Sequence, residues 1–199
     1  MSVLAHTTGA SASAVASEGR GGKFLTFYLA DEEYGVEILK VQEIIGMQPI
    51  TRVPRTPTFI RGVINLRGKV IPIMDLRERF AMASAESALA ALADAERAAA
   101  EALRCIIVVQ VALAAAGAQG QAVPMGIVVD RVSEVAAIAS GDVEDAPSFG
   151  AGVKTEYLLG LGKAKTADGQ GRVKLLLDID RVLAADELTA LTQAQDEAA

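Results

Sequence analysis

The sequence predicts a mainly β protein made of two small barrels, each of about five strands, packed together. Short runs of β-branched residues recur at regular spacing and are separated by turns that contain glycine, a pattern that favours barrels over a parallel α/β sheet. The order of elements also repeats. A hairpin, a connector and a second hairpin lead to Asp-Leu-Arg at 75–77, and the same order leads to Asp-Ile-Asp-Arg at 178–181. We interpret this repeat as an internal duplication.

The central feature is a hairpin within the segment 59–80, FIRGVINLRGKVIPIMDLRERF. Two apolar, β-branched runs flank the turn Arg67-Gly68-Lys69, and glycine accepts the positive φ that a tight hairpin turn requires. Pro72 has no N–H to give to a ladder, so we expect its strand to lie at an edge or a bulge. Polar residues are confined to the turn and its flanks, which indicates a charged rim and not an active site.

Composition limits the class of protein. The chain has 199 residues and a hydrophobic share of 51%, enough for one domain or two small ones with a substantial core. A net charge of −6 disfavours nucleic acid or an anionic membrane as the main partner. A single cysteine, Cys105, cannot form an internal disulfide, and no run of eighteen apolar residues or secretory signal is present. We therefore expect a soluble, cytoplasmic protein that does not insert into membranes.

The first half begins with a tail at 1–22 of small and polar residues, which we expect to be disordered and which contains the only histidine, His6. Strands are expected at 24–29 and 34–38. The apolar spacing of 39–45 predicts a short helix that Gly46 ends, before a rigid connector rich in proline.

The segment 84–104 interrupts the β pattern. It is rich in alanine, has no glycine or proline, and predicts one helix about 30 Å long at 1.5 Å per residue. We interpret it as an insertion between two β units, a spacer helix packed loosely by one side.

The second half resumes the strand pattern. Strands are expected at 105–113, 122–130 and 131–138, a hairpin at 158–161 and 173–177, and a short helix at 178–184. The expected division is a domain over 23–185, with the first barrel mainly at 23–80 and the second mainly at 105–184. A C-terminal helix and frayed end follow at 186–199.

The residue types offer little for catalysis. No histidine lies in the part expected to fold, so a histidine-activated nucleophile is excluded, and no cluster of cysteine and histidine could bind a metal. Cys105 opens an apolar strand, where an inert thiol is expected. The carboxylate pairs Glu32/Glu33 and Glu144/Asp145 fall in expected loops, where solvation is the default. We expect a binding protein with no catalytic residues, cofactor or metal; a carboxylate-dependent enzyme is a remote alternative.

Four segments together resemble the CheW family of chemotaxis coupling proteins. They are FLTFYLADEEYGVEILKVQEI at 24–44, the 59–80 segment, GIVVDRVSEV at 126–135 and TEYLLGLG at 155–162. The resemblance covers the chain from about Gly22 to the final helix. It implies two SH3-like barrels and a non-enzymatic adaptor that links methyl-accepting chemoreceptor tips to the regulatory domain of the histidine kinase CheA. A CheW-like scaffold of a pilus, biofilm or developmental pathway is the alternative.

The resemblance also implies candidate partner-binding residues. Glu43 and Arg67 match the characteristic acid–base pair of the family, either as a pair that orients a contact surface or as an ordinary surface salt bridge. Further candidates are the turn residues Asn65 and Gly68 and four positions of an apolar groove between the barrels, where core packing is the competing interpretation: Val36, Ile38, Gly126 and Val128. The 84–104 insertion departs from the family pattern.

Overall fold

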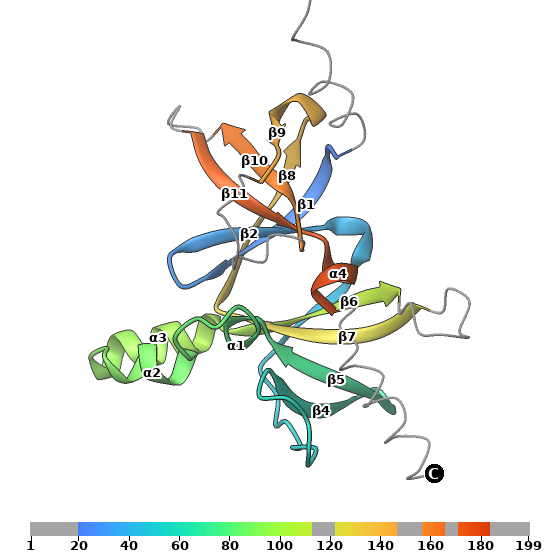
Figure 1. The fold of residues 1–199 in the computed structure, drawn as a ribbon. Helices are drawn as coiled ribbons and strands as arrows, with labels where there is room; N and C mark the ends of the chain where they lie inside the picture. The colour runs from blue at the N-terminus through green and yellow to red at the C-terminus, as the bar shows by residue number, and fades with distance from the viewer. Residues whose placement is uncertain (1–19, 113–121, 147–156, 166–170, 184–199) are drawn as a thin grey trace, which may run out of the picture.

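Two β-sheets, one above the other, make up the body of the protein in the computed structural model, which describes residues 20–112, 122–146, 157–165 and 171–183 (Figure 1). The six-stranded sheet has the order β8-β1-β2-β11-β10-β9, and the five-stranded sheet has the order β3-β6-β7-β5-β4. The strands are β1 (Gly22–Leu29), β2 (Glu32–Glu37), β3 (Val41–Gly46), β4 (Ile60–Leu66), β5 (Lys69–Asp75), β6 (Cys105–Ala112), β7 (Ala122–Val129), β8 (Arg131–Ile138), β9 (Val143–Glu144), β10 (Leu158–Lys165) and β11 (Gly171–Leu177). The helices are η1 (Ile38–Lys40), α1 (Leu76–Arg79), α2 (Ala85–Ala90), α3 (Asp94–Leu103), η2 (Ser140–Asp142) and α4 (Ile179–Leu183).

The mainly β class with two packed units is confirmed, but the expected division of the chain between them is wrong. The β1–β2 hairpin, expected in the first barrel, lies in the six-stranded sheet with β8 to β11. The β6–β7 hairpin, expected in the second, lies in the five-stranded sheet with β3, β4 and β5. Each half of the chain therefore contributes its first hairpin to one sheet and its later strands to the other. Hairpins form locally, whereas the sheet that a hairpin joins depends on long-range pairing that its own sequence does not specify.

The duplication is visible in matching local geometry. Irregularities interrupt β4 between Ile60 and Gly62 and β10 between Leu158 and Gly160, and both glycines have positive φ. The N–H of Asp75 donates to the carbonyl of Phe59, and the N–H of Asp178 donates to that of Tyr157, at 2.8 and 2.9 Å. The sheets also have the same strand order once the halves are superposed: β1, β2 and β11 correspond to β6, β7 and β5.

Apolar side chains form three clusters. The largest lies between the sheets and includes Phe27, Val36, Met74, Ile107 and Ile127. Each sheet also has its own smaller cluster, one with Ile64, Ile71, Ile73, Ile106, Val108 and Val128, and the other with Phe24, Ile138, Val143 and Leu176. Strand β6 shows how the sequence does this: Ile106 and Val108 point to the small cluster, and Ile107 and Val109 point to the large one. A strand buried on both faces reads as a continuous apolar run.

The helix predicted at 39–45 is wrong. Only Ile38–Lys40 is helical, as a 3₁₀ turn, and Val41–Gly46 forms the edge strand β3, which pairs antiparallel with β6. The spacing of apolar residues suited a helix, but β-branched residues also suit a strand, and the partner strand β6 is distant along the chain, as the pairing of Val41 with Val109 shows. The edge position expected for Pro72 is wrong, since β5 is an interior strand, but the alternative of a nearby bulge agrees with the irregularity of the β4–β5 ladder beside Ile73. Pro72 lies where the ladder with β7 begins, one residue before Ile73.

The insertion forms two helices, α2 and α3, instead of one continuous helix. Figure 1 shows them projecting from the side of the two-sheet body. Ser84 caps α2, with its hydroxyl accepting from the N–H of Ser87 at 3.1 Å, and the chain bends at Leu92 before α3 begins. Ala85 is buried, whereas α3 buries none of its side chains. The expected loose, one-sided packing is therefore observed.

The structure describes the last three residues of the expected N-terminal tail. Strand β1 begins at Gly22, and Arg20 forms an ion pair with Asp145, so residues 20–22 of the expected tail are ordered. The remainder of that tail, with His6, and the helix expected at 186–199 lie outside the described residues. Within the described ranges, no helix is long and apolar enough to cross a membrane.

Candidate partner-binding surface

The tip of the β4–β5 hairpin is a two-residue turn in which both central residues have positive φ, 53° at Arg67 and 85° at Gly68. This is the backbone conformation that matches the twist of paired strands. Asn65 supports it, because its Oδ1 accepts a hydrogen bond from the N–H of Gly68 at 2.8 Å. The glycine was expected to have positive φ. The positive φ of Arg67 was not, although it follows once the turn has two residues.

Arg67 extends from this turn to Glu43 on β3. Its Nη2 lies 2.8 Å from Oε2 of Glu43 and its Nη1 lies 3.3 Å from Oε1, so the guanidinium holds both carboxylate oxygens. Strands β3 and β4 are the two edges of the five-stranded sheet, so the pair joins edges that share no backbone ladder. Arg67 is 79% exposed and Glu43 is 26% exposed, an exposure at which an ion pair contributes about 0–1 kcal/mol. The predicted pair is therefore present, and its effect on stability is small.

Exposed apolar residues occur on the same sheet. Ile44 on β3 is 46% exposed and Val70 on β5 is 57% exposed. Both face away from the small core of the sheet, because their neighbours Ile45 and Ile71 pack into it and side chains alternate along a strand. The sequence analysis did not single out Ile44 or Val70. Strand alternation around Ile71 and Ile73 could have identified Val70, whereas Ile44 had been assigned to a helix.

The predicted apolar groove is corrected by burial. Val36 is fully buried in the core between the sheets, and Val128 is 4% exposed in the small core of the five-stranded sheet. Ile38 is partly buried against the inter-sheet core. None of these three positions presents an open apolar surface, because other apolar side chains of the two clusters pack over them.

Gly126 is also a packing position. A Cβ there would lie 2.4 Å from Cδ1 of Ile73 and 2.8 Å from Cγ2 of Ile106. Ile73 lies opposite Gly126 on β5 and Ile106 lies on the other neighbouring strand, β6, so the missing Cβ leaves room for these two β-branched side chains over the strand. The competing interpretation, core packing, is what the structure shows for this residue.

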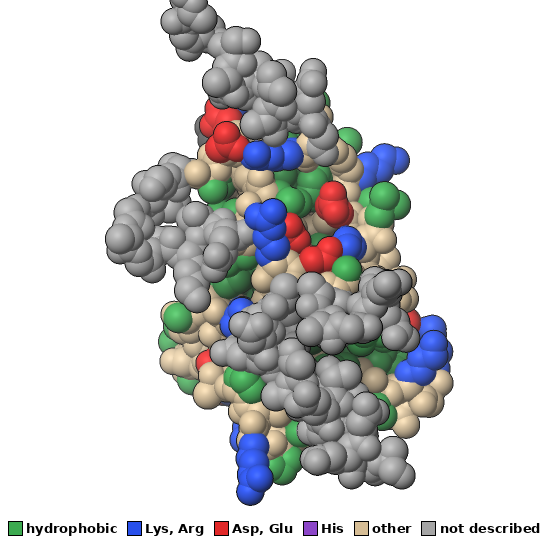
Figure 2. Space-filling model, turned by 45° about the vertical axis from the view of Figure 1, so that its right-hand side comes forward, with side chains coloured by type: hydrophobic (Ala, Val, Ile, Leu, Met, Phe, Trp, Pro, Cys, Tyr) green, Lys and Arg blue, Asp and Glu red, His purple; other side chains and the backbone are tan. Residues whose placement is uncertain are grey.

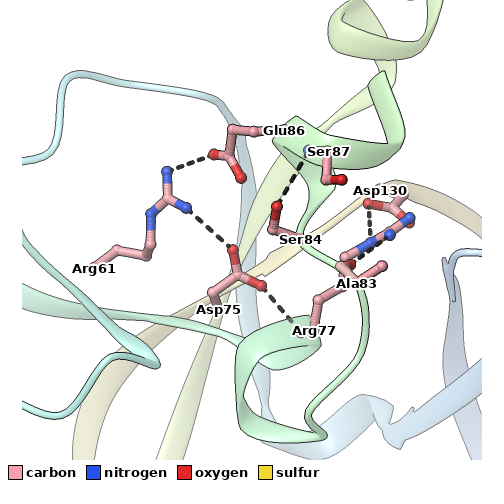
Figure 3. A network of polar contacts seen from close by, with 8 residues as sticks. All are labelled: Arg61, Asp75, Arg77, Ala83, Ser84, Glu86, Ser87 and Asp130. Atoms are coloured by element: carbon pink, nitrogen blue, oxygen red, sulfur yellow. Dashed lines mark hydrogen bonds and ion pairs between the residues drawn. The ribbon is translucent and has the colours of Figure 1, made fainter. Parts of the chain in front are cut away.

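A polar network at the base of the insertion was not predicted (Figure 3). Arg61 on β4 donates to Glu86 on α2 at 2.8 Å and lies 3.5 Å from Asp75. Asp75 caps α1, with Oδ1 accepting from the N–H of Arg77 at 3.0 Å. The hydrogen bond with Arg61 lowers the pKa of Glu86, and the same bond raises the pKa of Arg61. Both charges are therefore retained at neutral pH, and they attach α2 to the sheet.

Arg77 and Asp130 continue this network toward the six-stranded sheet. Nε of Arg77 lies 3.0 Å from both carboxylate oxygens of Asp130, and its Nη1 donates to the carbonyl of Ala83 at 3.0 Å. Asp130 lies between β7 and β8, where the chain passes from one sheet to the other, and it accepts from the N–H of Ala30 at 2.7 Å. The Asp-Leu-Arg repeat thus marks a connection between the sheets, which the sequence alone did not reveal.

One carboxylate expected to be solvated is buried. Glu33 is 6% exposed and accepts from Nζ of Lys174, itself 2% exposed, at 2.6 Å. Glu134 lies 3.2 Å from the same ammonium group. Burial raises the pKa of Glu33, but hydrogen bonds from Lys174 and Thr26 and the charge of Lys174 lower it by more, so the net shift is downward. The sequence could not reveal this pair, because 141 residues separate its members.

Neither a metal-binding cluster nor a thiol of lowered pKa occurs among the described residues. Within the described ranges, no group of three acidic, cysteine or histidine side chains could hold a metal ion. Burial raises the pKa of the half-buried Cys105, which keeps the thiol protonated. On the face shown in Figure 2, positive and negative side chains are interspersed with apolar ones.

Comparison with known proteins places this arrangement in a family. The CheW-like domain matches residues 23–187, and the chain belongs to that family. The chemotaxis protein CheW of Klebsiella aerogenes is 40% identical over 179 residues, which is 90% of this chain and 92% of that protein. The chemotaxis protein CheW of Treponema pallidum is 28% identical and covers 85% of this chain and 86% of its own length.

A solved structure agrees with the fold. The crystal structure of the scaffolding protein TtCheW from Thermoanaerobacter tengcongensis superposes with a TM-score of 0.62 at 29% identity, covering 84% of this chain and 95% of that one. The resemblance inferred from the four sequence segments is therefore confirmed.

Proposed function

We propose that the protein is a non-enzymatic adaptor that couples methyl-accepting chemoreceptors to the histidine kinase CheA. The observation that carries this proposal is the family match over 23–187, together with relatives that are named chemotaxis proteins and span nearly the whole chain. A solved relative described as a scaffolding protein supports the same role. On this proposal the chain works in the cytoplasm, on the receptor tips and the kinase.

An adaptor needs two surfaces that do not overlap, and we propose that they lie on the two related sheets of the duplicated fold. Ile44 lies opposite Ile107 of β6, and Val135 lies at the corresponding position opposite Leu25 of β1. Val70 lies five residues before Asp75, which ends β5. Val173 lies five residues before Asp178, which follows β11. All four are about half exposed, at 46%, 52%, 57% and 51% for Ile44, Val135, Val70 and Val173. Each sheet therefore displays a related pair of exposed β-branched residues.

We propose that Glu43, Arg67, Asn65 and Gly68 form the polar part of one such surface. The turn fixes the backbone, and the ion pair orients the guanidinium over the sheet edge. A rim charge acts on specificity and association rate more than on total contact area. Gly126 and Val128 pack within the five-stranded sheet that carries this surface, and Val36 and Ile38 pack in the core between the sheets.

A pull-down from the source cells tests the proposal. The tagged chain should capture a CheA-type kinase and a methyl-accepting receptor, identified by mass spectrometry. A receptor of a pilus, biofilm or developmental pathway in place of a chemotaxis receptor would favour the alternative scaffold. Capture of neither a kinase nor a receptor would refute both versions.

Calorimetry with ATP separates an adaptor from an enzyme. We expect no heat of nucleotide binding to the isolated chain, since the sequence contains no phosphate-binding loop. A nucleotide site of micromolar affinity would overturn the adaptor assignment.

A further inference from the structure

The chain crosses between the sheets at two related places. Strand β2 of the six-stranded sheet leads through η1 to β3 of the five-stranded sheet, and β7 of the five-stranded sheet leads through Asp130 to β8 of the six-stranded sheet. These are corresponding positions of the duplicated halves. The orientation of the sheets depends on how firmly both crossovers are held, because they are covalent links between two separately paired sheets.

Each crossover is held by an ion pair to the short helix that follows the last strand of the other half. At the first, Lys40 of η1 lies 2.5 Å from Oδ2 of Asp180 on α4. At the second, Asp130 is bonded to Arg77 on α1. Arg77 and Asp180 are both the second residue of their helix. The two pairs occupy matching places, but their charges are reversed: the acid is on the helix in one and on the crossover in the other.

A third element joins each pair. Asp180 accepts a hydrogen bond from the N–H of Ala112 at the end of β6, at 2.9 Å, through the oxygen that does not contact Lys40. Asp130 accepts one from the N–H of Ala30 after β1, at 2.7 Å. Each carboxylate, that of Asp180 or Asp130, thus binds a basic side chain and also a backbone N–H at the end of the first strand of a hairpin. Crossover, helix and hairpin are thereby connected at one point.

We propose that these two charge-reversed clasps, Lys40–Asp180 and Arg77–Asp130, set the orientation of one sheet relative to the other. The clasps differ in burial: Arg77 and Asp130 are 9% and 21% exposed, whereas Lys40 and Asp180 are each 30% exposed. The Lys40–Asp180 clasp is therefore the looser one, and it is the one that substitution can open without disturbing the core.

The second clasp provides the design of the test, because it shows that the reversed arrangement fits this fold. Lys40→Asp places two acids together, and Asp180→Arg places two cations together. The double variant carries the acid on the crossover and arginine on the helix, as at Asp130 and Arg77. Asp180→Arg removes the acceptor of the Ala112 N–H and should raise the amide exchange rate of Ala112 at least about fivefold, the effect of losing one hydrogen bond. Lys40→Asp leaves that acceptor in place, so its effect is measured on the orientation of the sheets. In the double variant the acid at position 40 should accept from Ala112 as Asp130 accepts from Ala30. The double variant should restore most of the protection.

Sheet orientation is measured directly by the distance between spin labels at Lys23 on β1 and Lys69 on β5, both exposed, in a Cys105→Ser background. The distance distribution should broaden in both single variants and narrow again in the double variant. The control is Lys163→Asp, which breaks the ion pair with Glu144 between two strands of the same sheet and should leave the distribution unchanged. Unchanged distributions in the single variants, or a double variant no better than the worse single one, would overturn the proposal. Loss of cooperative unfolding in a single variant would also contradict it, because it would assign these residues to the core.

Discussion

Arg67 has two physical roles that are separable. Its positive φ belongs to the hairpin turn, and its guanidinium belongs to the contact with Glu43. A non-glycine residue at positive φ carries a steric cost, which an asparagine or glycine would reduce. Keeping an arginine there is consistent with a role for its side chain beyond the turn.

Reversing the charge of Arg67 tests that role. Arg67→Glu should change the thermal midpoint little, because Arg67 is exposed and its replacement leaves no cavity in the core. The substitution places two acidic side chains together at positions 43 and 67, and it should therefore weaken complex formation. The double variant Glu43→Arg with Arg67→Glu should recover part of the lost affinity. A thermodynamic cycle measured on receptor and kinase binding quantifies the coupling. Absence of coupling would remove the pair from the interface, and unchanged binding in both single variants would place the interface elsewhere.

Gly126 tests the packing of the five-stranded sheet. Gly126→Ala should lower the free energy of unfolding by about 1–3 kcal/mol, because the added Cβ meets the side chains of Ile73 and Ile106 in a filled core. Gly46→Ala is the matched control, since a Cβ at that position in β3 has no neighbour within 4 Å. Denaturant unfolding measures both. Equal stability of the two variants would show that the core is less tightly packed than the distances indicate.

At the scale of elements, the parallel pairing of β2 with β11 carries the buried pair Glu33–Lys174. Glu33→Gln should destabilise the protein by about 3 kcal/mol at pH 7, the lower end for breaking a buried pair, because Glu134 also lies near Lys174. The folded-state pKa of Glu33 is below its unfolded value of 4.5, so its stabilising effect is complete above pH 4.5 and is lost as the pH falls through the folded pKa.

The difference in unfolding free energy between the wild type and Glu33→Gln should therefore shrink as the pH falls below 4.5. Glu144→Gln is the control, since its pair with Lys163 is more than half exposed and should show little effect at either pH. A difference that grew on acidification would mean that Glu33 is neutral in the folded protein.

The inserted helices are the most replaceable element. Replacing 84–104 with a short Gly/Ser linker should preserve the fold and lower the free energy of unfolding by no more than about 2 kcal/mol. The losses are one buried alanine, Ala85, and the half-exposed ion pair of Glu86 with Arg61. Circular dichroism and thermal melting test this. An insoluble or non-cooperative product would show that the helices belong to the core.

At the scale of the whole molecule, the sequence predicted the local features better than their assembly. The turn at 67–68, the β strands on both sides of it and the Glu43–Arg67 pair follow from turn chemistry, β-branched runs and family resemblance. The exchange of hairpins between the sheets does not follow from the sequence. An apolar strand residue such as Leu25 could be buried in the core on either sheet, so its apolar character does not indicate which sheet its hairpin joins. Val36 and Val128 were placed in a groove because an apolar residue on a strand can face a core or a surface equally well. Which of the two holds depends on the side chains that pack over that face of the sheet.

The adaptor account requires that one molecule hold both partners at once. The most direct measurement is sedimentation of the purified chain with a CheA regulatory domain and a receptor cytoplasmic fragment. The account predicts a complex that contains all three components, in which Arg67→Glu weakens assembly without unfolding the chain. Competition between kinase and receptor for this chain, or binding of only one of them, would contradict it.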